Sequence, residues 1–258
     1  MEACIDMTTE LSFPTSTGML VDSIETIMRP HDACTATLQP GAGGVRRLGL
    51  ALDSWSGLSR WAFEQRLDGL FLHRYRSLQS EALARRLAVV ANHDAFDRRF
   101  GFGDNAELHA LLKVNPFETL GFRDGLPLGT VSAGVPRPSE SLRALLVAAF
   151  GGVDEELPPE RPRRIARVAV ARAMTAELVR TAATLGADAY VTGQIRHPAR
   201  AAAAATGLHV FGVGHRRSEE WALQRLAALL CARWPGLEVR VRRECSARKP
   251  LTGSTRAS

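Results

Sequence analysis

The chain has 258 residues, of which 45% are hydrophobic and 23% charged, as in an ordinary globular protein. No apolar run reaches the ~20 residues of a membrane span, and the N-terminus lacks the basic and apolar segments of a secretion signal, so we expect a cytoplasmic protein with no membrane partner. The net charge is +6, but the basic residues are almost all arginines scattered among alanines, which argues against a nucleic-acid partner.

Apolar spacing and turn residues predict helices and strands along the whole chain. In the first part we expect, in order, a helix at 19–29, a loop at 37–44, a strand at 45–53, a helix at 57–67, a strand at 68–74, a helix at 80–88, a strand running into a polar loop at 89–97, a helix at 105–113, a β-rich connector at 117–132 and a helix at 138–152. A segment rich in proline and charge, 153–164, is the best internal break.

After this break, strands and helices alternate clearly. Strands are expected at 165–171, 187–193, 208–214 and 237–243, separated by helices at 174–186, 198–207 and 218–236. This alternation is typical of βαβ units with a mainly parallel sheet.

The two halves of the chain echo each other weakly. RLDGLFLHR (66–74) and GADAYVTGQIRH (186–197) each place an aspartate before an apolar strand and a polar residue or histidine after it. We therefore predict an α/β protein with two similar lobes whose mainly parallel sheets face a central cleft. The expected divisions are an irregular N-terminus (1–18), a first α/β lobe (19–125), a second α/β lobe (126–245) and a disordered tail (246–258).

Four of the seven histidines stand at or just after the C-terminal end of a predicted strand, where open α/β sheets bind ligands. They are His73, His93, His197 and His215. Asp97 and Glu219 lie beside two of them. Histidine and carboxylate ligands without cysteine suit zinc, iron or manganese. A bound ion of this kind can lower the pKa of water toward about 7, and a carboxylate can bridge two ions ~3.5–4 Å apart. The cleft is therefore predicted to bind metal.

A second interpretation of HRRSEE (215–220) stays open. This segment can be an ordinary helix start, with Ser218 as the N-cap and Glu219 and Glu220 at the positive end of the helix dipole.

Four segments occur in an order and at separations that resemble the Nif-three-like family, also known as GTP cyclohydrolase I type 2 homologues. They are DGLFLHR (68–74), NHDAFD (92–97), YVTGQIRH (190–197) and VFGVGHRRSEE (210–220). The similarity extends from about residue 19 to 245. It implies two like α/β lobes, a homohexamer, and a two-metal site in each subunit. The ligands that it implies are His73, Asp97, His215 and a bridging Glu219.

The sequence departs from the family pattern at HRYRS (73–77), where Arg74 replaces the second of two adjacent histidines. An arginine stays protonated and cannot ligate a metal. We therefore expect one well-bound ion, with the second weak or lost unless His93 or His197 supplies a ligand. Arg74 can instead grip an anionic substrate or Glu219 itself.

Two further departures affect the predicted ligand-binding surface. Gln194 follows TG where an acidic residue is usual, and ARAM (171–174) replaces a glycine-rich turn. Thr192 of the TG element is a candidate auxiliary or substrate contact, together with Arg74, His93 and His197.

Two functions are compatible with these residues. The first is a metal-dependent hydrolase that uses metal-activated water on a phosphate-bearing or nucleotide-like small molecule. The alternative is a non-catalytic metal-binding or regulatory scaffold with a partly degenerate, single-metal site. The loss of a histidine at Arg74 favours the alternative.

Overall fold

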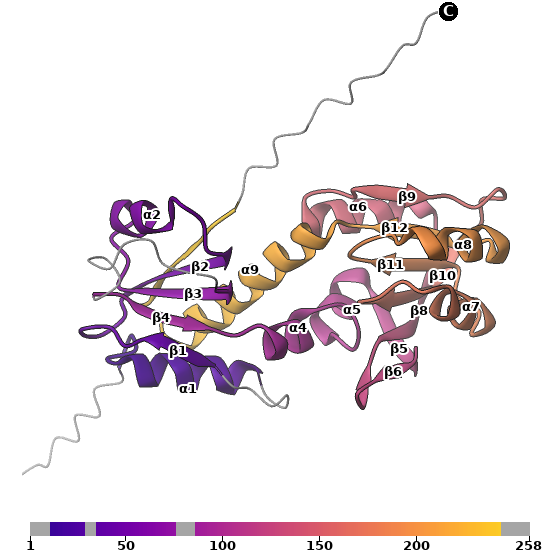
Figure 1. Cartoon of the computed structure of the whole chain (residues 1–258). Coiled ribbons are helices and arrows are strands. Elements are labelled where there is room, and N and C mark those ends of the chain that lie inside the picture. Colours follow the sequence, from indigo (N-terminus) through magenta and orange to yellow (C-terminus); the bar gives the residue numbers. More distant parts are fainter. Residues whose placement is uncertain (1–10, 29–34, 76–85, 244–258) are drawn as a thin grey trace, which may run out of the picture.

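A computed structural model of the chain describes residues 11–28, 35–75 and 86–243. It contains two α/β lobes that lie side by side, and the long helix α9 (His215–Arg233) runs from one lobe to the other (Figure 1). The predicted α/β class with two lobes is confirmed. None of the described helices is both long and apolar enough to cross a lipid bilayer.

The first lobe is built on a five-stranded sheet with the order β1-β4-β3-β2-β13. Four strands are parallel: β2 (Arg47–Asp53), β3 (Gly69–Arg74), β4 (Ala88–Ala91) and β13 (Glu238–Val241). The fifth, β1 (Ala36–Gln39), runs antiparallel to β4. The described helices of this lobe include α1 (Thr17–Met28) and α2 (Leu58–Glu64).

The second lobe is built on a six-stranded sheet with the order β5-β8-β10-β11-β12-β9. Its parallel centre consists of β10 (Ile165–Ala171), β11 (Ala189–Thr192) and β12 (His209–Gly212). Antiparallel strands flank this centre: β5 (Val114–Thr119), β8 (Gly129–Arg137) and β9 (Glu155–Leu157). The remaining elements are α4 (Asp94–Phe100), α5 (Ala106–Leu112), α6 (Ser139–Phe150), α7 (Ala176–Thr184), the 3-10 helix η1 (His197–Ala199), α8 (Arg200–Thr206) and the hairpin of β6 (Phe122–Arg123) and β7 (Leu126–Pro127).

Three sequence predictions differ from this structure. The loop expected at 37–44 begins with β1, an exposed edge strand whose few apolar residues gave no strand signal. The stretch 89–97 ends in α4 rather than in a loop. The segment 153–164 is not a break, because β9 within it pairs with β12. Most of the helix expected at 80–88, and the tail at 246–258, lie outside the described residues.

The two sheets do not separate at residue 125. Strand β5 already belongs to the second sheet, and β13 returns to pair with β2 of the first. The return is made by α9, whose length of 19 residues carries the chain across both lobes (Figure 1). Leu226 of α9 belongs to one buried cluster with Leu50 and Phe71 of the first sheet and Val191 and Phe211 of the second. This shared core joins the two lobes.

The weak echo between the halves has a structural counterpart in two aspartates, Asp68 and Asp188. Each stands directly before an apolar strand and uses Oδ2 to accept hydrogen bonds from two backbone N–H groups at the start of the preceding strand. The donors are Arg46 and Arg47, at 3.0 and 2.9 Å, for Asp68, and Ala166 and Arg167, both at 2.9 Å, for Asp188. The same pair of hydrogen bonds therefore ties the residue before one strand to the start of the neighbouring strand in both lobes.

Candidate metal centre

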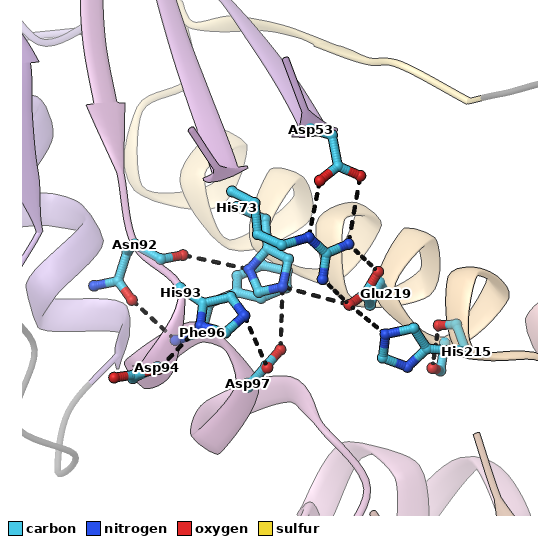
Figure 2. Close-up of polar contacts among 11 residues, drawn as sticks. Asp53, His73, Asn92, His93, Asp94, Phe96, Asp97, His215 and Glu219 are labelled. Atoms are coloured by element: carbon cyan, nitrogen blue, oxygen red, sulfur yellow. Dashed lines mark hydrogen bonds and ion pairs between the residues drawn. The ribbon is translucent and has the colours of Figure 1, made fainter. Parts of the chain in front are cut away.

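His73, His93 and Asp97 meet where β3 and β4 end. His73 is the second-last residue of β3, and the side chains of His93 and Asp97 come from the start of α4 (Figure 2). One ligand atom from each residue lies within 4.8 Å of the others. Asp97 Oδ1 is 3.4 Å from His73 Nε2, and Asp97 Oδ2 is 3.7 Å from His93 Nε2. These three residues form a group that could hold a metal ion.

The orientation of the His73 ring supports this. The side chain is buried, with Nδ1 3.4 Å from the carbonyl oxygen of Asn92. Its Nε2 makes no hydrogen bond within the described residues, although carboxylate oxygens of Asp97 and Glu219 lie 3.4 and 3.5 Å away. A ring that donates from Nδ1 presents the Nε2 lone pair as a ligand. With the ring in this tautomer, the Nε2 lone pair and the two carboxylates suit a divalent cation, whereas an Nε2–H would pair with the carboxylates directly.

His215 and Glu219 follow on the first turns of α9. His215 Nε2 is 3.1 Å from Glu219 Oε1, and Glu219 is only 6% exposed. The helix begins at His215 after Gly214, which has φ = 101°, so the prediction of Ser218 as the N-cap is wrong. Ser218 Oγ instead donates to the carbonyl of His215 at 2.6 Å.

Arg74 is the cation that pairs with Glu219. Its Nη1 and Nη2 donate to Oε1 and Oε2 of Glu219 at 2.7 and 2.8 Å, and its Nε donates to Asp53 Oδ1 at 2.8 Å. Of the two roles considered for Arg74, the structure therefore shows the grip on Glu219. Asp53, which the sequence analysis missed, ends β2 and could have been found by the same strand-end rule.

The charges in this cluster shift one another's protonation. Burial opposes ionisation of Glu219, but the contacts with His215 and Arg74 outweigh it and hold the pKa of this carboxyl well below its usual range. The hydrogen bond to Glu219 also raises the pKa of His215. Burial raises the pKa of Asp97, while His73 and His93 oppose that shift. Because the pKa of Asp97 is raised, its ionised form is the one in this cluster that a bound cation would stabilise most.

A cavity of about 200 Å³ borders the cluster. Its lining includes Phe96, Asp97, Phe102, Arg172, His215 and Glu219. Asp97 is 45% exposed and so faces this space, whereas the ring of His73 is fully buried. A ligand can therefore approach the cluster from the Asp97 side.

Two predicted auxiliary residues are not members of the group formed by His73, His93 and Asp97. His197 is exposed on η1 and contacts none of the cluster residues in the described part of the chain. Thr192 is buried at the end of β11, and its Oγ1 has no hydrogen-bond partner among the described residues. His93, by contrast, joins His73 and Asp97. The predicted ligand roles of His215 and Glu219 stay predictions.

Comparisons with known proteins show which family the chain resembles. The family model described as Duf34/NIF3 (NGG1p interacting factor 3) matches residues 61–250. A protein named GTP cyclohydrolase 1 type 2 homolog from Salmonella typhimurium is 27% identical over 216 residues, 83% of each chain. Its namesake from Archaeoglobus fulgidus is 27% identical over 149 residues, 56% of this chain and 57% of the other.

Solved structures share the fold at low sequence identity. Protein ybgI, described as of unknown function, has a TM-score of 0.67 and 19% identity, covering 89% of this chain and 96% of its own. TTHA1606 from Thermus thermophilus has a TM-score of 0.64 and 19% identity, covering 90% and 99%. Because the family model matches residues 61–250, which is most of the chain, the chain belongs to the Duf34/NIF3 family.

Proposed function

We propose that this protein binds one divalent metal ion through His73, His93 and Asp97, and that it is a metal-dependent hydrolase of a phosphate-bearing or nucleotide-like small molecule. The observation that carries the proposal is the buried Nε2 of His73, which faces carboxylates without a hydrogen bond in the described structure. Zinc, iron and manganese all accept such ligands. When bound, an ion of this kind lowers the pKa of water toward about 7 and so supplies a nucleophile.

The surrounding side chains have complementary tasks. The carbonyl of Asn92 fixes the ring of His73, and Asp97 borders the cavity through which a substrate approaches. His215 lines the same cavity, and its raised pKa keeps it protonated over a wider pH range. In this proposal, His215 would donate a proton to a leaving oxygen.

A non-catalytic metal-binding scaffold is the second candidate. The pairing of Arg74 with both oxygens of Glu219 favours it, because a bridging role for Glu219 would require this pairing to open. The guanidinium then supplies the positive charge that a second ion would bring. Hydrolysis that depends on two ions could not operate in such a site.

Metal content and hydrolysis, measured together, separate the two candidates. Protein purified without added metal is analysed by elemental mass spectrometry, then reloaded with zinc, iron(II) or manganese and assayed on bis(p-nitrophenyl) phosphate and nucleoside triphosphates. We expect about one ion per chain and hydrolysis that disappears on metal removal. Asp97→Asn should lose both, while Asp22→Asn, which alters an exposed carboxylate on α1, should keep both.

The possible outcomes divide cleanly. Metal binding without hydrolysis of any substrate would favour the scaffold. A protein that takes up none of the three metals would overturn both candidates.

A further inference from the structure

Three arginines line one cavity next to the metal cluster. The cavity measures about 290 Å³. It lies among α4, the β6–β7 hairpin and the turn after β10. Its lining residues are Arg98, Arg123, Asp124, Leu126, Leu128, Arg172 and Ala173.

This cavity adjoins the cluster on two sides. Arg172 also lines the 200 Å³ cavity together with Asp97, His215 and Glu219. Arg98 also lines the open pocket that contains His73 and His93. A ligand in the arginine-lined cavity would therefore lie beside the proposed metal site.

The guanidinium groups of these three arginines are available to a ligand. Within residues 11–28, 35–75 and 86–243, no hydrogen bond or ion pair links the side chain of Arg98, Arg123 or Arg172 to another residue. Other arginines near the site are paired, such as Arg74 with Glu219 and Arg217 with Asp154. Burial lowers the pKa of Arg172, and the charges of Arg98 and Arg123 lower it further.

The balance of charge in this cavity favours an anion. Asp124 is the one carboxylate among its lining residues and opposes three arginines. Like charges held together in a partly buried space repel each other, and a bound anion would remove that repulsion. Guanidinium groups bind phosphate oxygens through two parallel hydrogen bonds, which gives both affinity and orientation.

The backbone holds these arginines on defined elements. Arg172 follows β10 within the ARAM turn, and its backbone N–H donates to the carbonyl of Leu128 at 3.1 Å. Arg123 precedes the Asp124-Gly125 turn, where φ values of 53° and 74° are typical of a tight type I′ hairpin. Arg98 follows Asp97 directly in α4. The arrangement is therefore built into the fold.

We propose that Arg98, Arg123 and Arg172 form an anion-binding wall that holds the phosphate chain of a substrate with two or more phosphate groups. The shared Arg172 lets one end of a phosphate chain reach the Asp97 cavity while the other end lies between Arg98 and Arg123. The assignment as a substrate subsite rests on the proposed hydrolase function, whereas binding of the anion does not.

The test measures anion binding by metal-free protein using isothermal titration calorimetry. Inorganic tripolyphosphate, pyrophosphate and orthophosphate are compared as ligands. We expect tripolyphosphate to bind about tenfold more tightly than orthophosphate, and Arg172→Gln to weaken tripolyphosphate binding by about tenfold or more. Arg180→Gln is the matched control, because Arg180 is an exposed arginine on α7 that lines none of these cavities. It should bind tripolyphosphate as the wild type does.

Two results would contradict the proposal that these arginines form an anion-binding wall. Equal affinity in wild type and Arg172→Gln would do so, as would an equal loss in Arg180→Gln, which would reveal attraction to net charge alone. If Arg172→Gln does not fold, Arg123→Gln on the exposed hairpin replaces it with the same expectation. Adenosine triphosphate is tested as a further ligand. If it binds more tightly than tripolyphosphate, the site also contacts the nucleoside. If the two affinities are equal, the arginines recognise the phosphate chain alone.

Failure of this inference can be told from failure of the proposed function, since binding is measured without metal. Tripolyphosphate binding that depends on Arg172 in a protein that takes up no metal overturns only the hydrolase proposal. Metal-dependent hydrolysis in a protein that does not bind tripolyphosphate overturns only the wall.

Discussion

The guanidinium of Arg74 donates one hydrogen bond to each carboxylate oxygen of Glu219, at 2.7 and 2.8 Å. The two residues are 145 positions apart and join the end of β3 to the first turns of α9. Glu219 is 6% exposed, so this pair holds a buried carboxylate in its charged form. This ion pair therefore stabilises the fold and also fixes the charge state of a carboxylate in the candidate metal centre.

Arg74→Met should lower the free energy of unfolding by about 2–3 kcal/mol, because it leaves the Glu219 carboxylate buried without its bidentate partner. Urea unfolding followed by circular dichroism measures the change. Arg60→Met is the control: Arg60 pairs with Glu64 on the surface and is 84% exposed, so its removal should have little effect. Equal small losses in both variants would show that the Arg74 pair contributes no more than a surface pair.

His93→Ala should abolish metal binding, whereas His215→Ala should retain it. The reason is that His93 shares the donor group with His73 and Asp97, while the His215 side chain pairs with Glu219 in the described part of the chain. Metal content after dialysis checks both variants. Retention by His93→Ala together with loss by His215→Ala would restore the ligand set that the family resemblance implies.

Arg74→His should raise the metal content from about one ion per chain to about two. The substitution removes the guanidinium from Glu219 and adds an imidazole next to His73. Arg74→Met frees the same carboxylate without adding a ligand, so it should stay near one ion. A second ion in both variants would mean that Arg74 only blocks the site.

His109 should make stability depend on pH. It is buried, with Nε2 2.8 Å from Thr130 Oγ1, and burial lowers its pKa below 6.5. Its contribution to stability is therefore present above pH 6.5 and is lost as the pH falls through the lowered pKa of the folded state. The free energy of unfolding should fall less between pH 7 and about 5 in His109→Gln than in wild type. Parallel slopes in urea titrations of the two proteins would contradict this.

The sequence predicted the strand-end residues well, since β–α alternation fixes which edge of a sheet they occupy. His73 and His93 were found in this way, and both lie in the cluster. The choice between His93 and His215 as a ligand could not be made. It depends on α4 starting at Asp94, and the sequence pattern predicted a polar loop there.

Features assembled from distant segments escaped prediction for a different reason. Arg98, Arg123 and Arg172 come from a helix, a hairpin and a turn, so no local spacing connects them. The return of β13 to the first sheet likewise depends on the path of α9 across both lobes. Propensity and periodicity describe neighbours along the chain, and these contacts are not between neighbours.

The aspartates Asp68 and Asp188 align the two halves of the chain residue by residue, and five positions later His73 corresponds to Gly193. A Cβ atom at Gly193 would lie 3.3 Å from Ser218 Oγ and 3.7 Å from His215 Cα. A side chain at Gly193 would therefore meet the first turn of α9 in a tight contact. The second copy of this motif therefore offers no donor side chain at this position, and only the first of the two similar units places a histidine here.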